Sequence, residues 1–472
     1  MASALTATAW RPNDRAQSAL TRRSRADGAT VLTALVVLLF ALPARLVFPP
    51  LGAAGRPAGL AGLAVFGWWL LSHLVPSLTR RGRQPVRTAI LVYLYVYLIA
   101  YTLGYGRGLP GAEATSSDRA LLTTLGLAGI ALVAADGIPD RARLDVLLKR
   151  LTVGGALMAV LGEFQFVFGI DLVSKIKVPG LSLNAGLIGI ASRGDAGLRR
   201  VAGTASHYIE FGVVAALLLP LAIHYALHAR DRAERQWRWA IVAVIGAAVP
   251  FSISRSAFLC LIVSLVVLAT LWRIRMQAQA LAVAVVAMMA LRFVVPGLLG
   301  TIMSLFRNMG NDPSVQNREA DYPVVFRYIA ERPWFGRGPG TFMPERYILL
   351  DNEMLGTIVS IGYVGFAALL GVFVTGFFLA RSVSKHTVHP ETRHLAHALA
   401  AGIVGAMVAS LTFDSLGFPI FAGTLFLMVG AVGALWRTDR AATAMPPRDG
   451  REILKPNRLL RSAGRRRLEA TP

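Results

Sequence analysis

The chain has 472 residues, of which 55% are hydrophobic and only 16% are charged, and its formal net charge is +23. This composition is too apolar for a soluble protein of this length, and the apolar residues come in blocks, so it indicates a polytopic membrane protein. The single cysteine, Cys260, excludes an internal disulfide. The positive charge would suit a nucleic-acid partner, but the positions of the basic residues indicate a different cause.

Residues 1–28 are basic and polar, without the apolar core or the small-residue cleavage site of a signal peptide. We therefore expect no cleaved leader, and the first apolar block is predicted to be a signal anchor. Arg45 and Arg292 fall inside predicted spans. Twelve apolar segments approach the length that a helix needs to cross the hydrocarbon: about 29–49, 57–78, 88–105, 120–136, 151–170, 208–228, 239–253, 254–272, 279–300, 355–380, 394–413 and 417–436.

The short connections between these segments are basic on one side only. If the N-terminus is cytoplasmic, 32 of the 49 Lys and Arg residues lie in cytoplasmic pieces and 15 on the opposite side, 11 of them in the loops 171–207 and 301–354. The positive-inside rule then places both termini in the cytoplasm. The prediction is an all-α polytopic membrane protein with a basic N-terminus (1–28), a twelve-span domain (29–436) with these two large extracytoplasmic loops, and a basic tail (437–472). Most of the net charge then reflects topology and contact with anionic lipid, and no nucleic-acid partner is expected.

The first long loop ends in a polar motif that leads into a span. It combines the basic pair Arg199 and Arg200, a Gly-Thr turn and His207. This combination suits an anionic ligand, although a topological anchor with a helix cap would look the same. A second motif places Arg255 between two serines on the outer side. Placing an arginine near hydrocarbon costs free energy unless it has a partner, so Arg255 indicates a functional site. Alternatively, Arg255 belongs to a tight turn between spans and lies in the headgroup layer.

The second long loop is rich in arginine. Because the guanidinium group is planar, always charged and able to grip phosphate with two hydrogen bonds, six arginines favour a phosphate-bearing ligand. They are Arg307, Arg318, Arg327, Arg332, Arg337 and Arg346.

A short helix is predicted over 321–332, with Asp321 as its cap, Arg327 and Glu331 paired at i,i+4, and Pro333 ending it. The glycine-rich turn that follows could let backbone N–H groups approach phosphate. No Walker-type lysine accompanies it, which argues against nucleotide hydrolysis.

Asp351, Asn352 and Glu353 stand just before the next span. Their carboxylates could accept a proton from a hydroxyl, or the group could simply begin a helix. Glu163 and Asp414 lie in or near spans and suit either a proton path or structural hydrogen bonding. Metal chemistry is not expected, because the histidine pairs are predicted to be cytoplasmic and Glu319 and Asp321 form a bare acidic pair. Those histidine pairs are His386 with His389 and His394 with His397.

Taken together, these stretches resemble the O-antigen ligase/O-antigen polymerase superfamily of bacterial envelope proteins. The resemblance covers about 195–435 and rests on motifs that occur in the family's order. They are Arg200-x-x-Gly203-Thr204-x-x-His207, Ser254-Arg255-Ser256-Ala257, Arg318 with Tyr322, Glu331-Arg332-Pro333-x-x-Gly336-x-Gly338-x-Gly340-Thr341-Phe342, and Asp351-Asn352-Glu353-x-Leu355 with Gly362-Tyr363-x-Gly365.

The resemblance implies a GT-C-like membrane glycosyltransferase in the bacterial cytoplasmic (inner) membrane. Such proteins transfer a glycan from undecaprenyl pyrophosphate to an acceptor hydroxyl on the outer face, without a metal or other cofactor, and their partners include chain-length and flippase proteins. Arg200 and Arg318 would bind the pyrophosphate as catalytic residues, supported by Arg255. The remaining residues expected to bind substrate are Arg199, Arg327, Arg337, Gly338 and Asn352.

The chain departs from the family at one position. Ligases that load glycan onto a lipid A core usually have a histidine before the asparagine that is Asn352 here, and this chain has Asp351 instead. The residue that activates the acceptor could therefore be Asp351, Glu353 or His207. The departure favours a polysaccharide polymerase, or a ligase with another acceptor, over a lipopolysaccharide ligase. A transporter or flippase of lipid-linked glycans and a non-catalytic assembly partner remain as alternatives.

Overall fold

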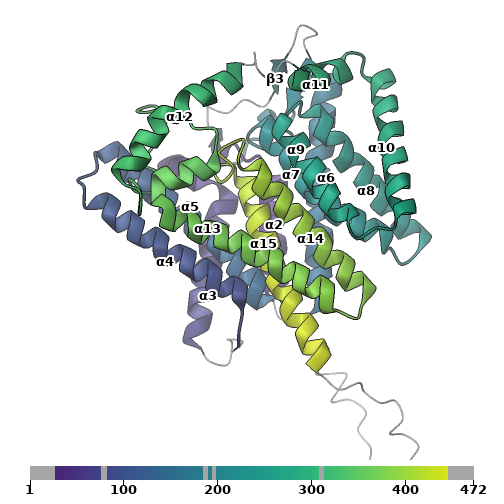
Figure 1. Ribbon diagram of the computed structural model, residues 1–472, viewed down its shortest axis with the longest axis horizontal. Coiled ribbons are helices and arrows are strands. Elements are labelled where there is room, and N and C mark those ends of the chain that lie inside the picture. The colour runs from purple at the N-terminus through teal and green to yellow at the C-terminus, as the bar shows by residue number, and fades with distance from the viewer. Residues whose placement is uncertain (1–26, 76–81, 184–189, 194–197, 308–312, 445–472) are drawn as a thin grey trace, which may run out of the picture.

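The computed structural model describes residues 27–75, 82–183, 190–193, 198–307 and 313–444. Most of this part of the chain is helical (Figure 1). Its α-helices are α2 (Gly28–Ala41), α3 (Pro57–Leu74), α4 (Pro85–Tyr105), α5 (Gly111–Gly137), α6 (Arg141–Phe168), α7 (Tyr208–Leu227), α8 (Arg232–Phe251), α9 (Arg255–Ala269), α10 (Ile274–Val294), α11 (Leu298–Arg307), α12 (Pro313–Glu331), α13 (Glu353–His386), α14 (Pro390–Ala409) and α15 (Pro419–Ala444).

Each of the twelve predicted segments coincides with one helix, from α2 to α10 and from α13 to α15. Eight of the described helices are long and apolar enough to cross a membrane, so the all-α polytopic class is confirmed. The others fall short by length or composition. For example, α2 has 14 residues and α9 has 15, which at about 1.5 Å per residue is less than the roughly 30 Å of hydrocarbon.

Short polar side chains set several helix starts. The side chain of Asp27 accepts a hydrogen bond from the Thr30 backbone N–H, and those of Asp140 and Asp231 cap α6 and α8 in the same way. These caps satisfy N–H groups that have no partner within the helix. At the other end of α6, Gly169 adopts a left-handed conformation with φ of 70° and stops the helix.

The first predicted span is too long in the prediction. Instead of continuing to residue 49, α2 ends at Ala41, and Pro43 follows in an irregular turn. Arg45 therefore lies beyond the helix rather than inside a span, and its Nη2 pairs with Asp171 Oδ2 at 3.0 Å. The physical reason is local, because proline cannot continue a helix and biases the preceding residue away from helical geometry.

The helix in the second long loop is also longer than predicted. It begins at Pro313, so Asp321 lies in its interior and is not its cap, and Pro323 is accommodated within the helix. Its end at Glu331, before Pro333, is as expected. The predicted pair of Arg327 and Glu331 is present at 4.0 Å, with Arg327 exposed.

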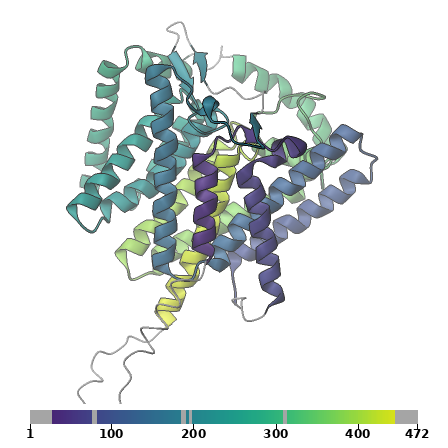
Figure 2. The same ribbon diagram turned by 180° about the vertical axis from the view of Figure 1, so that it is seen from behind.

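The connections that were predicted to be extracytoplasmic meet at one end of the bundle. Strand β1 (Leu46–Val47) pairs with β2 (Ser182–Leu183), and β3 (Ile190–Arg193) pairs with β4 (Leu198–Val201), all antiparallel. A 3₁₀ helix at Pro49–Gly55 and a short one at Val173–Lys175 complete these segments. Figure 1 shows β3, α11 and α12 at the same end of the molecule, and Figure 2 shows this end from behind.

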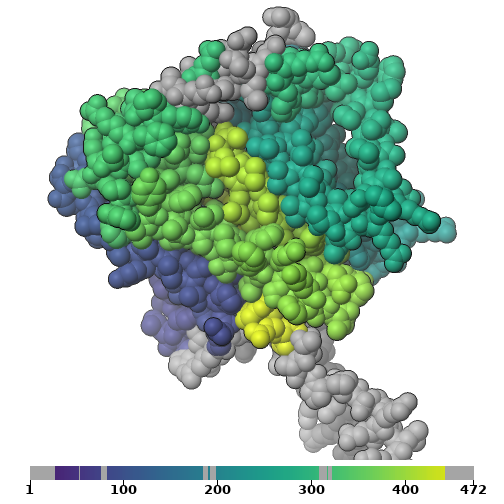
Figure 3. All heavy atoms as spheres, viewed as in Figure 1, coloured from purple at the N-terminus to yellow at the C-terminus, as the bar shows by residue number. Residues whose placement is uncertain are grey.

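Helices α7, α14 and α15 form the interior of the bundle, with nearly every residue of α7 buried. In contrast, α10 has no buried residue. Figure 3 shows this helix at the edge of the molecule, separated from the body along part of its length. Its apolar side chains therefore face the surroundings, as expected for a helix that contacts lipid.

Helix α13 is broken at Gly362, and the glycine-rich turn fills the break. Gly362 has φ of 72° and ψ of −177°. Two donors released by the break, the N–H groups of Tyr363 and Val364, bond to the carbonyls of Pro333 and Trp334 at 2.8 and 3.2 Å. Two released acceptors, the carbonyls of residues 359 and 360, accept from residues 337 and 338 at 2.9 and 3.0 Å. All four backbone groups are thus satisfied, as hydrocarbon surroundings require.

This arrangement makes Gly362 a test of loop docking. A Cβ there would lie 2.2 Å from the Trp334 backbone at a positive φ, so Gly362→Ala should destabilise the protein by about 1–3 kcal/mol or more. Gly371→Ala on the same helix is the matched control, because nothing lies within 4 Å of its added methyl group. Thermal unfolding in detergent should show a lower melting temperature for Gly362→Ala and no loss for Gly371→Ala. Equal melting temperatures would contradict the described break.

Candidate functional site

Arg200 lies in β4 and is almost fully buried, at 8% exposure. Its guanidinium group stacks on the ring of Tyr208 at 3.9 Å, and its Nη2 donates a hydrogen bond of 2.7 Å to the Ile253 carbonyl. These contacts fix the cation between the start of α7 and the α8–α9 turn. A positive charge held rigidly in low-dielectric surroundings can stabilise negative charge that develops nearby.

The α8–α9 turn that receives Arg200 is strained. Ile253 has φ of +44°, which is unfavourable for a β-branched side chain and costs on the order of 1–3 kcal/mol. The turn also packs tightly against α7, because a Cβ on Gly212 would lie 2.3 Å from Ser252 Oγ. Arg255 is the first residue of α9 and follows this turn directly. The strained residue therefore lies next to two of the predicted arginines, because Arg200 bonds to its carbonyl and Arg255 follows it by two residues.

His207 caps α7, as the interpretation of its motif as a topological anchor with a helix cap predicted. Its Nδ1 accepts a hydrogen bond from the Ile209 backbone N–H at 3.3 Å, and its ring centroid lies 3.9 Å from that of Tyr208 and 5.8 Å from that of Phe418. Burial, and then the positive charge of Arg200, lower the pKa of His207 to about 4 against the opposing effect of Asp351. The ring is therefore neutral at pH 7 with its proton on Nε2, so it can donate a hydrogen bond but accepts a proton poorly.

Asp351 comes close to the same place from the second long loop. It is partly exposed and lies near enough to influence the protonation of both His207 and Asp414. Asp414, in the turn between α14 and α15, is exposed. We refer to Arg200, His207, Arg255 and Asp351 as the arginine–histidine cluster.

Two buried glutamates hold the α14–α15 turn (residues 410–418) next to this cluster. Glu210 accepts hydrogen bonds from the backbone N–H groups of Ile420 and Phe421 and from the N–H and hydroxyl of Ser206, at 2.6–3.2 Å. Glu353 accepts from the Leu416 N–H at 2.8 Å and from the Thr357 hydroxyl at 3.0 Å. These bonds tie the Glu353 carboxylate to the α14–α15 turn and to its own helix.

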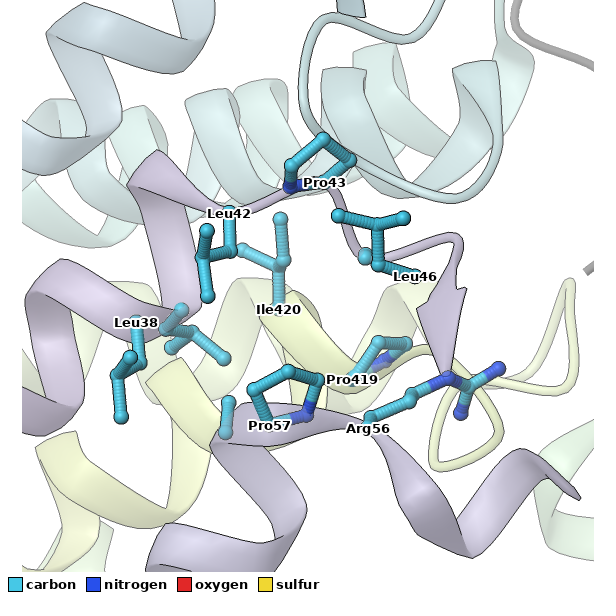
Figure 4. Close-up of a pocket in the computed structure, with 11 residues that line it drawn as sticks. Leu38, Leu42, Pro43, Leu46, Arg56, Pro57, Pro419 and Ile420 are labelled. Carbon is cyan, nitrogen blue, oxygen red and sulfur yellow. The ribbon is translucent and has the colours of Figure 1, made fainter. Parts of the chain in front are cut away.

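Arg56, at the start of α3, was not predicted as part of the site. Its Nη1 donates to the Gly417 carbonyl at 3.3 Å, and its charge interacts with Glu210 and Asp414. Figure 4 shows its side chain at the rim of a small apolar void, with the guanidinium group turned away from Leu42. The void has a volume of about 10 Å³, which is room for about one water molecule and not for a glycan.

Asn352 and Gly338 have structural partners. The side-chain carbonyl of Asn352 accepts hydrogen bonds from the N–H groups of Met354 and Leu355 at 3.0 and 3.1 Å and so caps α13. Gly338 donates its N–H to the Ser360 carbonyl, and its backbone packs against that of Gly104 in α4. The N–H groups at 337 and 338, which were expected to approach phosphate, are engaged by α13.

Arg337 is part of a separate polar and aromatic contact between the second long loop and α5. It pairs with Glu331 at 3.2 Å, donates to the Tyr347 hydroxyl at 2.9 Å and stacks on the ring of Tyr328. The Tyr347 hydroxyl in turn donates to Glu113 at 2.9 Å. These contacts dock the loop, and they lie apart from the arginine–histidine cluster.

The remaining predicted arginines lie elsewhere or outside the described side chains. Arg199 is exposed, and its Nη1 donates to the carbonyls of Phe166 and Val167 at the end of α6. Arg327 is 81% exposed on α12. Arg318 lies on the same helix, but its side chain falls outside the part of the chain whose side chains the structure describes.

The low pKa of His207 has a consequence for stability. Because its folded pKa of about 4 is below the unfolded value of 6.5, the native state is favoured above pH 6.5 and loses this contribution as the pH falls from 6.5 towards 4. His207→Gln should therefore lose less stability than the wild type between pH 7.5 and pH 4.5, as measured by thermal unfolding. His386→Gln, at an exposed position, should keep the wild-type pH dependence. An unchanged drop in His207→Gln would contradict the assignment.

Comparison with known protein families gives a match to one region of the chain. Residues 239–379 match the family described as O-antigen ligase, and no curated protein matches the chain. A chain of the solved structure described as "Structural coordination of polymerization and crosslinking by a peptidoglycan synthase complex" aligns with a TM-score of 0.40 and 19% identity, covering 76% of this chain and 98% of that one. The family match spans α8 to α13, and it includes Arg255, Arg318 and Asp351 but not Arg200 or His207. Residues 239–379 of this multi-pass membrane protein are thus similar to the O-antigen ligase family, which confirms the resemblance to the O-antigen ligase/O-antigen polymerase superfamily.

Proposed function

We propose that this protein polymerises undecaprenyl-pyrophosphate-linked oligosaccharide on the outer face of the bacterial cytoplasmic membrane. The observation that carries the proposal is the buried guanidinium of Arg200 beside His207 and Asp351, next to an O-antigen ligase domain. Membrane glycan ligase or polymerase activity follows from the family in general terms. Transfer to a distinct acceptor is the alternative within the same chemistry.

The arginines would stabilise the leaving group. In the transfer, a bond forms between the acceptor oxygen and the anomeric carbon of the donor glycan, and the bond from that carbon to the pyrophosphate oxygen breaks. The departing undecaprenyl pyrophosphate gains negative charge, which Arg200 and Arg255 would neutralise together with Arg318. Fixed cations of this kind can replace the metal that many phosphate-releasing enzymes use, so the proposed reaction is metal-independent.

Asp351 is the best candidate to accept the acceptor's proton. His207 is neutral with its lone pair committed to the α7 cap, and the Glu353 carboxylate is committed to Leu416 and Thr357. Asp351 is partly exposed and close to both His207 and Asp414. His207 would then orient the substrate through Nε2–H.

The proposed topology has twelve spans with both termini in the cytoplasm. The described contacts support it, because connections predicted on the same side bond to one another. On the outer side Arg200 bonds to the α8–α9 turn, and Arg107 donates to the Arg337 carbonyl. On the cytoplasmic side Arg143 pairs with Asp27 at 2.7 Å and Lys149 with Glu234 at 2.6 Å. Residues 1–26 and 445–472, which include most of the predicted basic termini, lie outside the described residues.

The direct test uses purified protein in lipid with an undecaprenyl-pyrophosphate repeat unit as the only substrate. A ladder of longer lipid-linked products is expected, and Arg200→Ala should reduce it roughly 100-fold, as loss of one electrostatic stabiliser typically does. Arg232→Ala, at an exposed position on the opposite end of the bundle, is the control and should keep the ladder. Product only after a second glycan is added would indicate a ligase. Intact donor in both assays would refute the proposed activity.

Asp351→Asn keeps the shape of the side chain but removes its ability to take a proton. Turnover should fall about 100-fold or more, as is typical for loss of a general base, while donor binding persists. Binding is measured by equilibrium titration with a labelled donor and turnover by product release. Glu345→Gln, an exposed carboxylate in the same loop, should leave both unchanged. Full turnover in Asp351→Asn would assign proton transfer to another group.

A further inference from the structure

Three histidines meet at the end of the bundle opposite the arginine–histidine cluster. His224 and His228 lie at the C-terminal end of α7, and His394 lies near the start of α14. One ring nitrogen from each lies within 4.8 Å of those of the other two. His224 and His394 are buried, at 2% and 8% exposure. The sequence spacing had paired His394 with His397, but His397 bonds instead to the Thr270 hydroxyl and the Val267 carbonyl.

The hydrogen bonds of this cluster define which nitrogens carry lone pairs. His228 Nδ1 lies 2.9 Å from the His224 carbonyl, which can only accept, so Nδ1 carries the proton and Nε2 keeps its lone pair. An imidazole oriented by a backbone carbonyl in this way is typical of metal-binding histidines. The Nδ1 atoms of His224 and His394 lie 3.1 Å apart. Two imidazole ligands of a tetrahedral zinc ion, each about 2.0–2.1 Å from the metal, would be separated by roughly 3.4 Å.

We propose that His224, His228 and His394 form a binding site for a late first-row divalent metal ion such as Zn²⁺, with solvent in the fourth position. Neutral imidazole is a preferred ligand of such ions. The bound ion would join the C-terminal end of α7 to the start of α14. This site lies at the far end of α7 from the proposed catalytic residues, so it does not depend on the proposed function.

The charges around the cluster are balanced. Arg141 and Lys149 are the cations near His224, but Arg141 pairs with Asp145 at 2.9 Å and Lys149 with Glu234 at 2.6 Å. These carboxylates offset the repulsion that the two cations would exert on a metal ion.

Trp272 competes with the metal for His394. Its indole N–H donates to His394 Nε2 at 3.2 Å, which places the remaining imidazole proton on Nδ1, where it bonds to His224. Metal binding through Nδ1 requires this proton to move to Nε2, so the tryptophan loses its acceptor and no net proton is released. Removal of this hydrogen bond should therefore strengthen metal binding.

The test is calorimetric titration of the full-length protein, purified in detergent without a polyhistidine tag, with Zn²⁺. One saturable site is expected in the wild type, and titration with Co²⁺ should give the visible spectrum of a tetrahedral ion. His228→Gln, at a half-buried position that should tolerate the change, and His394→Gln should each weaken Zn²⁺ binding at least tenfold. The matched control His386→Gln, at an exposed position, should bind as the wild type does.

Trp272→Phe provides the opposite change. Loss of a hydrogen bond worth about 1 kcal/mol that holds His394 in the other tautomer should tighten Zn²⁺ binding about fivefold. Absence of a saturable site in the wild type, wild-type affinity in both histidine variants, or weaker binding in Trp272→Phe would each overturn the proposal.

Discussion

The buried polar backbone groups of the α14–α15 turn and of the start of α15 must have hydrogen-bond partners, and the rest of the candidate site depends on how these are supplied. Glu210 from α7 bonds to the first N–H groups of α15, Glu353 from α13 bonds to Leu416, and Arg56 bonds to Gly417. Each unsatisfied buried group would cost several kcal/mol. The starts of α3, α7, α13 and α15 are consequently fixed relative to one another, and with them the positions of His207 and Asp351.

Much of this fold could be predicted, because a run of about 20 apolar residues has few alternatives to a membrane helix. The strands could not, because β1 and β2 are two residues long and pair across distant parts of the sequence. Proline caused two errors in the predicted helix boundaries. Helix α2 ends early near Pro43, whereas Pro323 is tolerated inside α12.

At the site, the motifs indicated Arg200, His207, Arg255 and Asp351. Glu210 was missed, although a glutamate three residues after a helix cap commonly bonds back to the cap; here it bonds to Ser206, one residue before the cap His207.

The arginines of the two long loops illustrate what a sequence leaves open. Arg337 and Arg200 both stack on tyrosines and both are largely buried. The charge of Arg337 is also neutralised by Glu331, within a contact that extends to Glu113 in α5. Arg200 instead lies near His207, which caps α7, and bonds to the carbonyl of the strained residue Ile253. The difference lies in partners that come from elsewhere in the chain, and no local pattern encodes it. Residue type predicts affinity for anions but cannot assign each cation to packing or to chemistry.

The break in α13 links two parts of the molecule mechanically. In a continuous helix, the N–H groups of Tyr363 and Val364 would bond to the carbonyls one turn earlier, but here the segment from Pro333 to Gly338 takes both sets of partners. The loop cannot withdraw without leaving four backbone groups bare or letting the helix straighten. Helix α12 leads directly into this segment, so a displacement of α12 would bend α13 about Gly362. The second long loop and this helix would therefore move together.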